Sequence, residues 1–446
     1  MVLPVATPAE MRAIDADAPE PTKILIQRAA YAVANAAIGM LGGGYGRRVS
    51  IIAGKGNNGE DGRMAARLLT RRGVSCSLHQ PGTALRDDSN LVIDAAYGTG
   101  FRDRWDSPPQ PDSAVLAVDL PSGVDGLTGQ DRGSLRAQRT VTFGALKPGL
   151  LLEPGASRAG RIEVADLGLN ISGCRAALIT DEDLQEPLSQ RIATDHKWSN
   201  SVRIIGGSPG MTGATQLAAK GALRAGAGMT VVSSPTVEAA ELNLPTEAVA
   251  RPIPPDNWAA EVLIDLERFS ALLVGPGLGT DGETLAVAAE LIERAPIPVV
   301  IDADALSAVA AHPNCLKNRS APTVLTPHDG EFKTLTGAQP DLDRCAAVRS
   351  AAQHAVVLLK GPTTLVANPD GDLIFVRSGD RRLATAGSGD VLAGIIAALI
   401  GYHPTHLAVA AAAHWHGRAA MLAEPGMIAN DLPSLLQPAR SAMLSS

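Results

Sequence analysis

The sequence predicts two α/β domains joined by a short linker. The chain has 446 residues, more than one hydrophobic core usually serves, so at least two domains are expected. Short β-rich runs alternate with helical segments in two successive series. The polar, proline-containing stretch of residues 181–194 separates the series, and we place the domains at residues 1–185 and 186–446.

The first series begins with two helices in residues 10–38, separated by a proline-rich turn. An apolar strand at residues 49–54 leads through a glycine-rich loop into a helix at residues 62–73. The further β-rich runs lie at residues 74–80, 91–98, 114–121 and 139–146. This alternation predicts a doubly wound parallel sheet with helices on both faces.

The second series follows the linker and has the same alternating character. Helices are expected at residues 213–226 and 283–295, and the closing part is strongly helical from Val391 to Leu422. The expected strands lie in residues 202–207, 229–234, 271–277, 298–306, 323–328, 355–361, 363–371 and 372–379. The chain therefore carries a second α/β unit after the first.

The composition is that of a globular protein, with 45% hydrophobic and 19% charged residues. A formal net charge of −7 argues against nucleic acid or an anionic membrane as the main partner. The four cysteines form no C-x-x-C pair, which favours free thiols in a reducing compartment. No signal-peptide pattern is present, and the apolar stretches 391–404 and 407–415 are interpreted as core helices. We therefore expect a cytoplasmic protein without a membrane span.

The strand ends of the first series carry candidate binding residues. The loop after residue 53 is rich in glycine and asparagine and opens a helix, whose first N–H groups are available to an anion. "DAAYGTGF" (94–101) and "DLPSGVDG" (119–126) each end an apolar run with an acidic residue and small residues. Ligands of doubly wound sheets bind beyond the carboxyl ends of the strands. Asn58, Asp94 and Ser122 supply the oxygen donors that a hard cation prefers.

With "GKGNNGEDG" and "ALKPGL", these motifs make residues 8–170 resemble the YjeF N-terminal family, the NAD(P)H-hydrate epimerases. The resemblance implies a Rossmann-like fold that interconverts the R and S epimers of the hydrated cofactors NADHX and NADPHX. It also implies a potassium ion bound by Asn58, Asp94 and Ser122. We expect Asp119, or an acid held near it, to transfer the proton. The substrate-binding residues that the resemblance implies are Asn57, Asn58, Gly59, Glu60, Asp61, Gly98, Thr99, Gly100, Phe101, Arg102, Asp103, Arg104 and Asp119.

Departures from the family pattern leave a second interpretation of this domain open. Glu60 stands where the family usually has glycine, and Asp103 lies near another such position. "IQRAA" (26–30) replaces the usual "MENAG". The alternative is a binding or sensing module that has lost catalysis.

The strand ends of the second series carry a different chemistry. "GGSPGMTGA" (206–214), "VGPGLGT" (274–280), "TPHDGEF" (326–332) and "LLKGPTTLV" (358–366) each follow an apolar run. In "ATAGSGDVLAG", Gly387, Ser388 and Gly389 precede an apolar helix, so their N–H groups and the helix dipole favour a phosphoryl group. Asp390 is then placed to take the proton of an attacking hydroxyl.

This constellation resembles the ribokinase-like superfamily and, over residues 195–435, the YjeF C-terminal family, the NAD(P)H-hydrate dehydratases. The resemblance implies that the ring hydroxyl of the S epimer is phosphorylated by ADP, and that AMP and phosphate are released as NAD(P)H forms. The implied hydrate contacts are Ala214, Gly279, His328 and Asp390. The implied nucleotide contacts are Lys360, Gly361, Pro362, Thr363, Thr364 and Gly389.

Other interpretations stay open at this point. A ribokinase-like sugar or vitamin kinase with a non-catalytic N-terminal domain would also use Asp390 as its base. Asp302 or Asp304 is a candidate to position magnesium. Lys55 and Lys147 are equally well interpreted as exposed loop cations, and His414 and His416 as core or surface residues. We expect a homo-oligomer that acts on small molecules.

Overall fold

The computed structural model describes residues 2–188, 192, 194–340, 342–403 and 405–445. These form two compact units, one of residues 3–176 and one made mainly of residues 177–446. The predicted boundary, between residues 185 and 186, falls inside the second unit, because Asp181–Leu184 already forms a 3₁₀ turn (η1) with buried Leu184.

The N-terminal unit is built on a parallel six-stranded sheet of order β3-β2-β4-β5-β6-β7. Because β3 and β4 lie on opposite sides of β2, the order reverses beside β2 and leaves a crevice at the strands' carboxyl ends. Its elements are β1 (Leu3–Val5), α1 (Pro8–Ala16), α2 (Thr22–Leu41), β2 (Arg48–Ala53), α3 (Asn57–Arg71), β3 (Ser75–His79), β4 (Leu91–Ala95), β5 (Ala114–Val118), β6 (Arg139–Phe143), α4 (Pro148–Leu151), α5 (Gly155–Ala159) and β7 (Arg161–Ala165).

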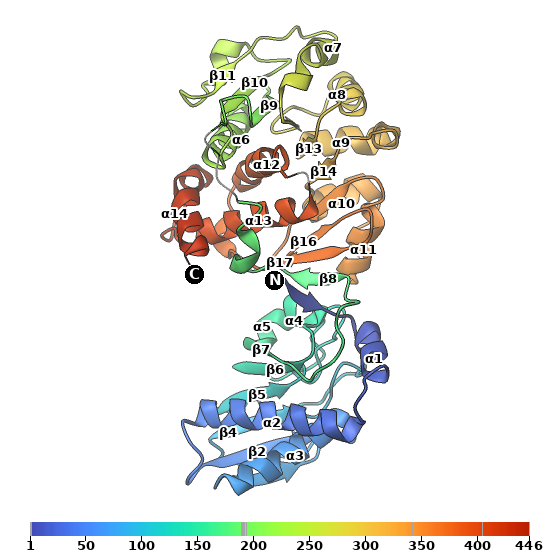
Figure 1. Ribbon diagram of the computed structural model, residues 1–446, viewed down its shortest axis with the longest axis vertical. Helices are drawn as coiled ribbons and strands as arrows, with labels where there is room; N and C mark the ends of the chain where they lie inside the picture. Colours follow the sequence, from blue (N-terminus) through green and yellow to red (C-terminus); the bar gives the residue numbers. More distant parts are fainter. Residues whose placement is uncertain (1, 189–191, 193, 341, 404, 446) are drawn as a thin grey trace. The chain divides into compact units, whose positions relative to one another are not determined.

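Two layers of side chains cover this sheet. Helices α2 and α3 pack together on one face, where their alanines and leucines join the inward residues of the strands in one core (Figure 1). On the other face, Trp105 and Leu135 come from the loops that follow β4 and β5. The sequence predicted helices on both faces, and loop residues supply much of the second layer.

Helix α2 is the one described helix that is long and apolar enough to cross a membrane, with a mean hydropathy of 1.4 over its most apolar window. Seven of its residues are buried, and they lie along the face that packs in the core of the N-terminal unit. A core helix satisfies the same test of length and composition.

The C-terminal unit has a larger, mixed sheet in which the strands run in the order β8-β17-β16-β15-β14-β13-β12-β9-β10-β11. Neighbouring strands from β14 through β13, β12, β9 and β10 to β11 pair in parallel. Strands β15, β16 and β17 form an antiparallel meander. The strands are β8 (Ala176–Leu178), β9 (Ser201–Ile205), β10 (Met229–Ser233), β11 (Val249–Ala250), β12 (Ala271–Val274), β13 (Val299–Ile301), β14 (Thr323–Leu325), β15 (Val356–Leu359), β16 (Thr364–Ala367) and β17 (Leu373–Val376). The order reverses beside β9, which gives this sheet its own crevice.

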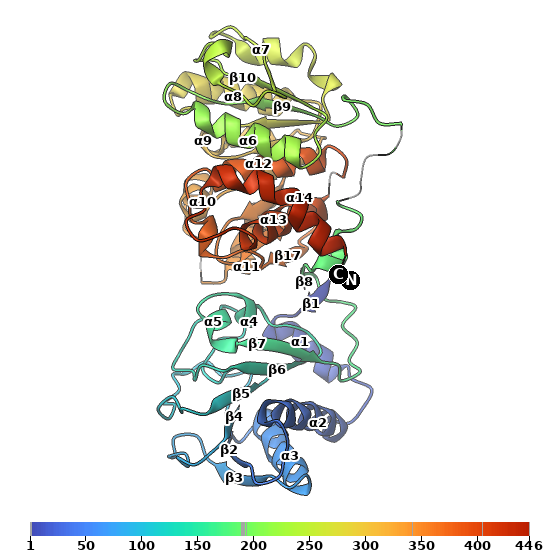
Figure 2. The ribbon, with the colours of Figure 1, turned by 90° about the vertical axis from the view of Figure 1, so that its left-hand side faces the viewer.

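Helices α6, α12, α13 and α14 share one hydrophobic core with the strands of this sheet (Figure 2). Helices α9, α10 and α11 follow one another along the side of β13, β14 and β15 (Figure 1). The helices of the unit are α6 (Thr212–Arg224), α7 (Trp258–Leu263), α8 (Gly282–Arg294), α9 (Asp304–Ala311), α10 (Asp329–Thr336), α11 (Arg344–Ala351), α12 (Ser388–Ile400), α13 (His406–Met421) and α14 (Leu432–Leu444), with 3₁₀ turns η2 (Ala239–Leu242), η3 (Leu266–Arg268), η4 (Pro313–Leu316), η5 (Arg381–Leu383) and η6 (Ala429–Asp431). The predicted class of two α/β domains is confirmed.

Candidate active sites in the two domains

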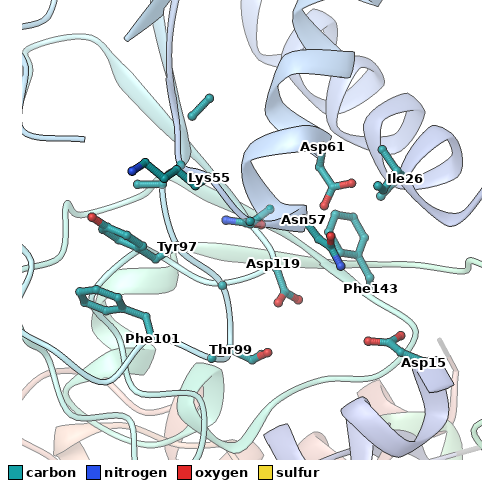
Figure 3. Close-up of a pocket in the computed structure, with 18 of the residues that line it drawn as sticks. Asp15, Ile26, Lys55, Asn57, Asp61, Tyr97, Thr99, Phe101, Asp119 and Phe143 are labelled. Atoms are coloured by element: carbon teal, nitrogen blue, oxygen red, sulfur yellow. The ribbon is translucent and has the colours of Figure 1, made fainter. Parts of the chain in front are cut away.

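The N-terminal unit contains a cavity of about 1200 Å³ at the carboxyl ends of β2, β4 and β5. The first turn of α3, the glycine-rich loop before it, and residues of α1 and α2 complete its wall (Figure 3). Gly59 makes this arrangement possible, because a Cβ there would lie only 1.9 Å from the carbonyl oxygen of Gly54. The loop therefore folds back tightly against the helix that it opens.

Asp119 lies directly after β5, and its carboxylate points into the cavity (Figure 3). Its backbone adopts a φ of 67°, a left-handed conformation that is uncommon for a residue other than glycine. The Nζ of Lys147 donates to Asp119 Oδ1 at 2.7 Å, to Thr142 Oγ1 at 2.9 Å and to the Phe143 carbonyl at 2.9 Å. Only 2% of the Lys147 side chain is exposed, so its interpretation as an exposed loop cation is wrong.

Asp61 and Asp15 present two further carboxyl groups to the same cavity (Figure 3). Burial, together with the charges of Asp119, Glu60 and Asp15, raises the pKa of Asp61 to about 8. Desolvation also raises the pKa of Asp15, partly offset by Lys147. The cavity thus places a carboxyl group that keeps its proton near neutral pH beside a carboxylate paired with a lysine.

Of the predicted potassium ligands, Asn58 lines the cavity, whereas Asp94, in β4, and Ser122, after β5, contact each other and are not among its lining residues. Asp94 is fully buried and accepts hydrogen bonds from the Ser122 hydroxyl at 2.6 Å and the Ser122 N–H at 2.8 Å. Burial raises the pKa of Asp94 and these hydrogen bonds partly offset the rise, so that the pKa is about 6. The amide oxygen and nitrogen of Asn58 are buried without a hydrogen-bond partner among the described residues. An unpaired buried amide is costly, so a ligand for the Asn58 oxygen fits this position.

The structure brings together only part of the predicted substrate-binding set. Those that line the cavity are Asn57, Asn58, Asp61, Gly98, Thr99, Gly100, Phe101 and Asp119. Gly59, Glu60, Arg102, Asp103 and Arg104 are not among its lining residues, and all of these except Gly59 are exposed.

Glu60 points away from the cavity and pairs with Arg63 at 2.9 Å. Arg63 in turn donates to the Gly54 carbonyl at 2.8 Å and lines the cavity. The charged residue that departs from the family pattern therefore does not narrow the binding space.

The C-terminal unit places its candidate site at the start of α12. Gly387 caps this helix with a φ of 88°, which favours glycine. The Ser388 hydroxyl donates to the Leu383 carbonyl at 2.8 Å, and the Ser388 N–H lies 3.3 Å from the Thr385 carbonyl. The N–H groups of Gly389 and Asp390 come next, before the Val391 N–H donates to the Gly387 carbonyl, and the start of a helix in this form suits an anion.

Lys360 comes from the end of β15, and its side chain reaches the first turn of α12. Its Nζ lies 3.6 Å from the position of a Cβ built on Gly389, 2.9 Å from Asp302 Oδ1 and 3.5 Å from Glu331 Oε2. Burial lowers the pKa of Lys360, but the charges of Asp302 and Glu331 outweigh it and the net shift is upward. Lys360 therefore stays protonated beside the first turn of α12.

Asp390 lies in the first turn of α12 among other carboxylates. Burial and the charge of Asp302 raise the pKa of Asp390 and Lys360 opposes the shift, with a net pKa of about 7. A carboxylate with this pKa is balanced between accepting and releasing a proton at neutral pH. The geometry fits a general base beside an anion-binding helix start.

The remaining predicted hydrate contacts come from neighbouring strand ends. The N–H of Gly279 donates to Asp304 Oδ2 at 2.9 Å, so the loop after β12 is tied to the start of α9. Ala214, in the first turn of α6, lies near Gly277 of the same loop. His328 caps α10 by accepting from the N–H groups of Gly330 and Glu331 at 2.9 and 3.2 Å, and 60% of its side chain is exposed.

The predicted nucleotide contacts form the turn between β15 and β16, from Lys360 to Thr364. Gly361 lies against the guanidinium of Arg344, which is held by Asp329 at 2.7 and 3.0 Å. Thr363 is buried and Thr364 begins β16. Asp302, a candidate for magnesium, is already held by Lys360 and by the Thr326 hydroxyl at 2.7 Å.

Comparisons with known proteins agree with this geometry. A family model described as NAD(P)H-hydrate dehydratase matches residues 202–438, and one described as YjeF-related protein N-terminus matches residues 22–86 and 75–149. The bifunctional NAD(P)H-hydrate repair enzyme Nnr of Moorella thermoacetica is 37% identical over 437 residues, covering 84% of this chain and 82% of that protein. The chain belongs to the family of bifunctional NAD(P)H-hydrate repair enzymes.

Further members of the repair-enzyme family support the assignment. The Mycobacterium tuberculosis enzyme of the same name is 36% identical over 421 residues, covering 85% of each chain. A crystal structure of the ADP/ATP-dependent NAD(P)H-hydrate dehydratase of Bacillus subtilis, co-crystallised with ATP and Mg²⁺, is 31% identical with a TM-score of 0.52. It covers 60% of this chain and 98% of that protein. The resemblance of both domains is confirmed, and the matches favour the repair-enzyme family over the sugar or vitamin kinase.

Sequence reasoning missed two residues of the candidate sites and the role of a third. Lys147 and Glu331 were not singled out as site residues with roles, and Asp61 was predicted to bind substrate but not to hold a proton. Lys147 lies in the loop after β6 and precedes a proline at the first position of α4, so its place beside Asp119 depends on β5 and β6 being neighbours. His414 and His416 are both buried, and His414 Nε2 lies 2.7 Å from Asp181 Oδ1.

Proposed function

We propose that this chain repairs hydrated nicotinamide cofactors in two steps. The N-terminal domain interconverts the R and S epimers of NADHX and NADPHX. The C-terminal domain converts the S epimer to NADH or NADPH at the expense of ADP, releasing AMP and phosphate. The observation that carries the proposal is the arrangement of Asp390 and Lys360 around the first turn of α12.

In the C-terminal domain, Asp390 takes the proton of the ring hydroxyl while that oxygen attacks the terminal phosphorus of ADP. Lys360 and the N–H groups of Gly389 and Asp390 stabilise the charge on the phosphoryl oxygens. The phosphate then leaves with the C–O bonding electrons, and loss of a ring proton forms the C=C bond. Phosphorylation is needed because hydroxide is a poor leaving group. Magnesium, when bound, neutralises phosphate charge, and Asp302 or Asp304 offers oxygen ligands near Asp390.

Ala214, Gly279 and His328 are assigned to the hydrate in this scheme. His328 uses Nδ1 to cap α10, and its Nε2, which lies 3.6 Å from Glu331 Oε1, is the ring nitrogen assigned to a polar group of the substrate. The turn from Lys360 to Thr364 is assigned to the nucleotide.

In the N-terminal domain, the cavity is large enough for a nicotinamide nucleotide, and Asp119 is assigned to proton transfer. Lys147 stabilises the ionised Asp119 carboxylate and fixes its direction. Asn58, Asp94 and Ser122 are assigned to potassium, because the buried Asn58 oxygen lacks a partner and Asp94 supplies negative charge. The bound ion would supply positive charge beside these residues.

The decisive experiment uses mixed NADHX epimers with ADP or ATP and Mg²⁺, and follows the return of NADH absorbance. Full recovery supports both activities. Recovery of the S portion alone, beyond slow spontaneous epimerisation, contradicts the epimerase and favours a non-catalytic N-terminal module. A stable phosphorylated product from a sugar or vitamin would contradict the dehydratase.

The potassium assignment has its own test. Asp94→Ala is expected to slow epimerisation and to abolish its stimulation by K⁺ over Na⁺. An unchanged response to potassium excludes Asp94 as a ligand.

We also propose a cytoplasmic location and a homo-oligomeric state. The free cysteines Cys76, Cys174, Cys315 and Cys345 suit a reducing compartment. Light scattering during size-exclusion chromatography tests the oligomeric state, and a monomer mass would contradict it.

A further inference from the structure

The N-terminal cavity holds more carboxyl groups than substrate binding requires. Asp15 comes from α1, Asp61 from the first turns of α3, and Asp119 from the end of β5, and all three point into one cavity (Figure 3). Of these three, Asp119 alone has a lysine at ion-pair distance among the described residues. A ligand in this space therefore meets carboxyl groups in two different electrostatic settings.

Asp61 has a setting that keeps a proton on the carboxyl group. The residue is 6% exposed, and its Oδ1 is buried without a hydrogen-bond partner among the described residues. The charged groups that act on it are the carboxylates of Asp119, Glu60 and Asp15, all of the same sign. Lys147 is directed to Asp119 and has all three of its N–H groups engaged there. None of these groups stabilises the ionised form of the Asp61 carboxyl, in agreement with its raised pKa.

The chemistry of the substrate calls for such an acid. Water adds to an enamine double bond with its oxygen on the carbon bonded to nitrogen, so the hydroxyl of a hydrated nicotinamide ring is on a carbon next to the ring nitrogen. Inversion at this carbon follows if the C–O bond breaks and reforms on the other face. The departing oxygen needs a proton, because hydroxide leaves poorly, and the returning water must lose one.

We propose that Asp61 is the general acid of epimerisation, donating its proton to the ring hydroxyl, while Asp119 accepts a proton from the water that returns. This inference rests on the proposed epimerase function. The C–O electron pair leaves with oxygen as water, and the nitrogen lone pair forms a C=N bond. Water then adds to the opposite face, its oxygen forms the new C–O bond, and its proton goes to Asp119. Exchange of one proton with solvent restores the starting state.

The geometry of α3 explains why this residue is available. Asn57 and Asp61 are four residues apart and therefore share one face of the helix, which is the face toward the cavity. Glu60 lies about 100° away around the helix and pairs outside with Arg63. A carboxyl at residue 61 thus faces the substrate, whereas its neighbour faces solvent.

The test uses the full chain carrying Asp390→Asn, so that epimers are not consumed, and measures R and S NADHX by chromatography. Asp61→Asn in this background is expected to lower kcat by about 10²- to 10⁴-fold with little change in KM. Asparagine is isosteric with the protonated carboxyl, so the thermal midpoint below pH 7 should stay unchanged. Asp17→Asn, an exposed exchange of the same type at the end of α1, is the matched control and should keep the parent rate.

Two further readouts separate an acid from a structural residue. The parent rate should fall as pH rises through about 8, the pKa of Asp61, and the residual rate of Asp61→Asn should lack this fall. In H₂¹⁸O, each inversion should introduce one labelled oxygen.

The outcomes distinguish this inference from the function on which it rests. If the parent chain does not epimerise NADHX, the proposed function fails and the inference with it. If the parent is active and Asp61→Asn stays within threefold, or inversion proceeds without ¹⁸O uptake, only the inference is overturned. If Asp61→Asn does not fold, Asp61→Glu and the parent pH profile decide: an unchanged rate up to pH 10 would exclude the acid.

Discussion

The two domains each pair an aspartate with a lysine beyond the carboxyl ends of parallel strands, but the two lysines differ. Lys147 is 2% exposed and has all its N–H groups fixed on Asp119, Thr142 and Phe143. Lys360 is 21% exposed and is shared by Asp302 and Glu331 next to a helix start. A lysine with no free donor can only orient its partner, whereas a partly exposed lysine can also bind a phosphate.

The aspartates differ in the same sense. Asp119 is stabilised as a carboxylate by its own lysine, so the N-terminal cavity relies on a second carboxyl, Asp61, to carry a proton. Burial and the neighbouring carboxylates hold the pKa of Asp390 at about 7, and the nearby Lys360 is turned toward Asp302. We infer from this difference that the N-terminal site moves protons, whereas the C-terminal site places a phosphoryl group beside a base.

Substitution of Asp390 is expected to have the largest effect and is the strongest test of the difference between the two sites. Asp390→Asn should lower the dehydratase rate by about 10²- to 10⁴-fold, because no carboxylate then accepts the hydroxyl proton. NADH recovery from purified S-NADHX with ADP and Mg²⁺ measures the effect. The epimerase rate of the same variant is the internal control and should not change. Retained dehydration would remove Asp390 from the mechanism.

The structural role of Lys147 gives the next largest effect. Lys147→Met should lower the free energy of unfolding by about 3–5 kcal/mol, because it leaves Asp119 without its counter-charge. Urea unfolding followed by circular dichroism measures this loss. The double variant Lys147→Met/Asp119→Asn should recover part of the stability, and equal losses in the single and double variants would show that charge pairing is not the cause.

The pH dependence of the two activities tests whether Asp390 acts as a base and Asp61 as an acid. A base must be ionised, so the dehydratase rate should rise about tenfold per pH unit below the pKa of Asp390, about 7, and then level off. An acid must be protonated, so the epimerase rate should fall above the pKa of Asp61, about 8. Separate assays of each activity between pH 5 and pH 10 check this. Parallel profiles for both activities would contradict the assignment.

The smallest effect is expected at Glu60. Its side chain is 49% exposed and its pair with Arg63 is a surface ion pair, worth about 0.2–1 kcal/mol at most. Glu60→Gly, which restores the residue usual in the family, should change the epimerase rate by less than about threefold. A large gain would mean that Glu60 restricts the cavity after all, as the binding-module interpretation requires.

Motif spacing predicted many residues of both candidate sites. The positions of residues around helix α3 explain part of what the spacing did not predict. Glycine-rich loops after apolar runs marked the strand ends correctly, because parallel strands bring all their carboxyl ends to one edge. Within "NNGED" the spacing alone did not separate Asp61 from Glu60, although the four-residue step from Asn57 to Asp61 is a usable signal. Lys147 and Asp119 are 28 residues apart, and the sequence contains no local pattern that joins them.

The sequence by itself determined the two α/β units, the strand-end loops and the family, because alternating periodicity and ordered motifs are local properties of the chain. Tertiary structure decided which polar groups share a cavity, which lysine is buried, and which carboxyl keeps its proton. These depend on strand order, on helix rotation and on desolvation, and each of them arises only when segments far apart in sequence pack together and exclude water.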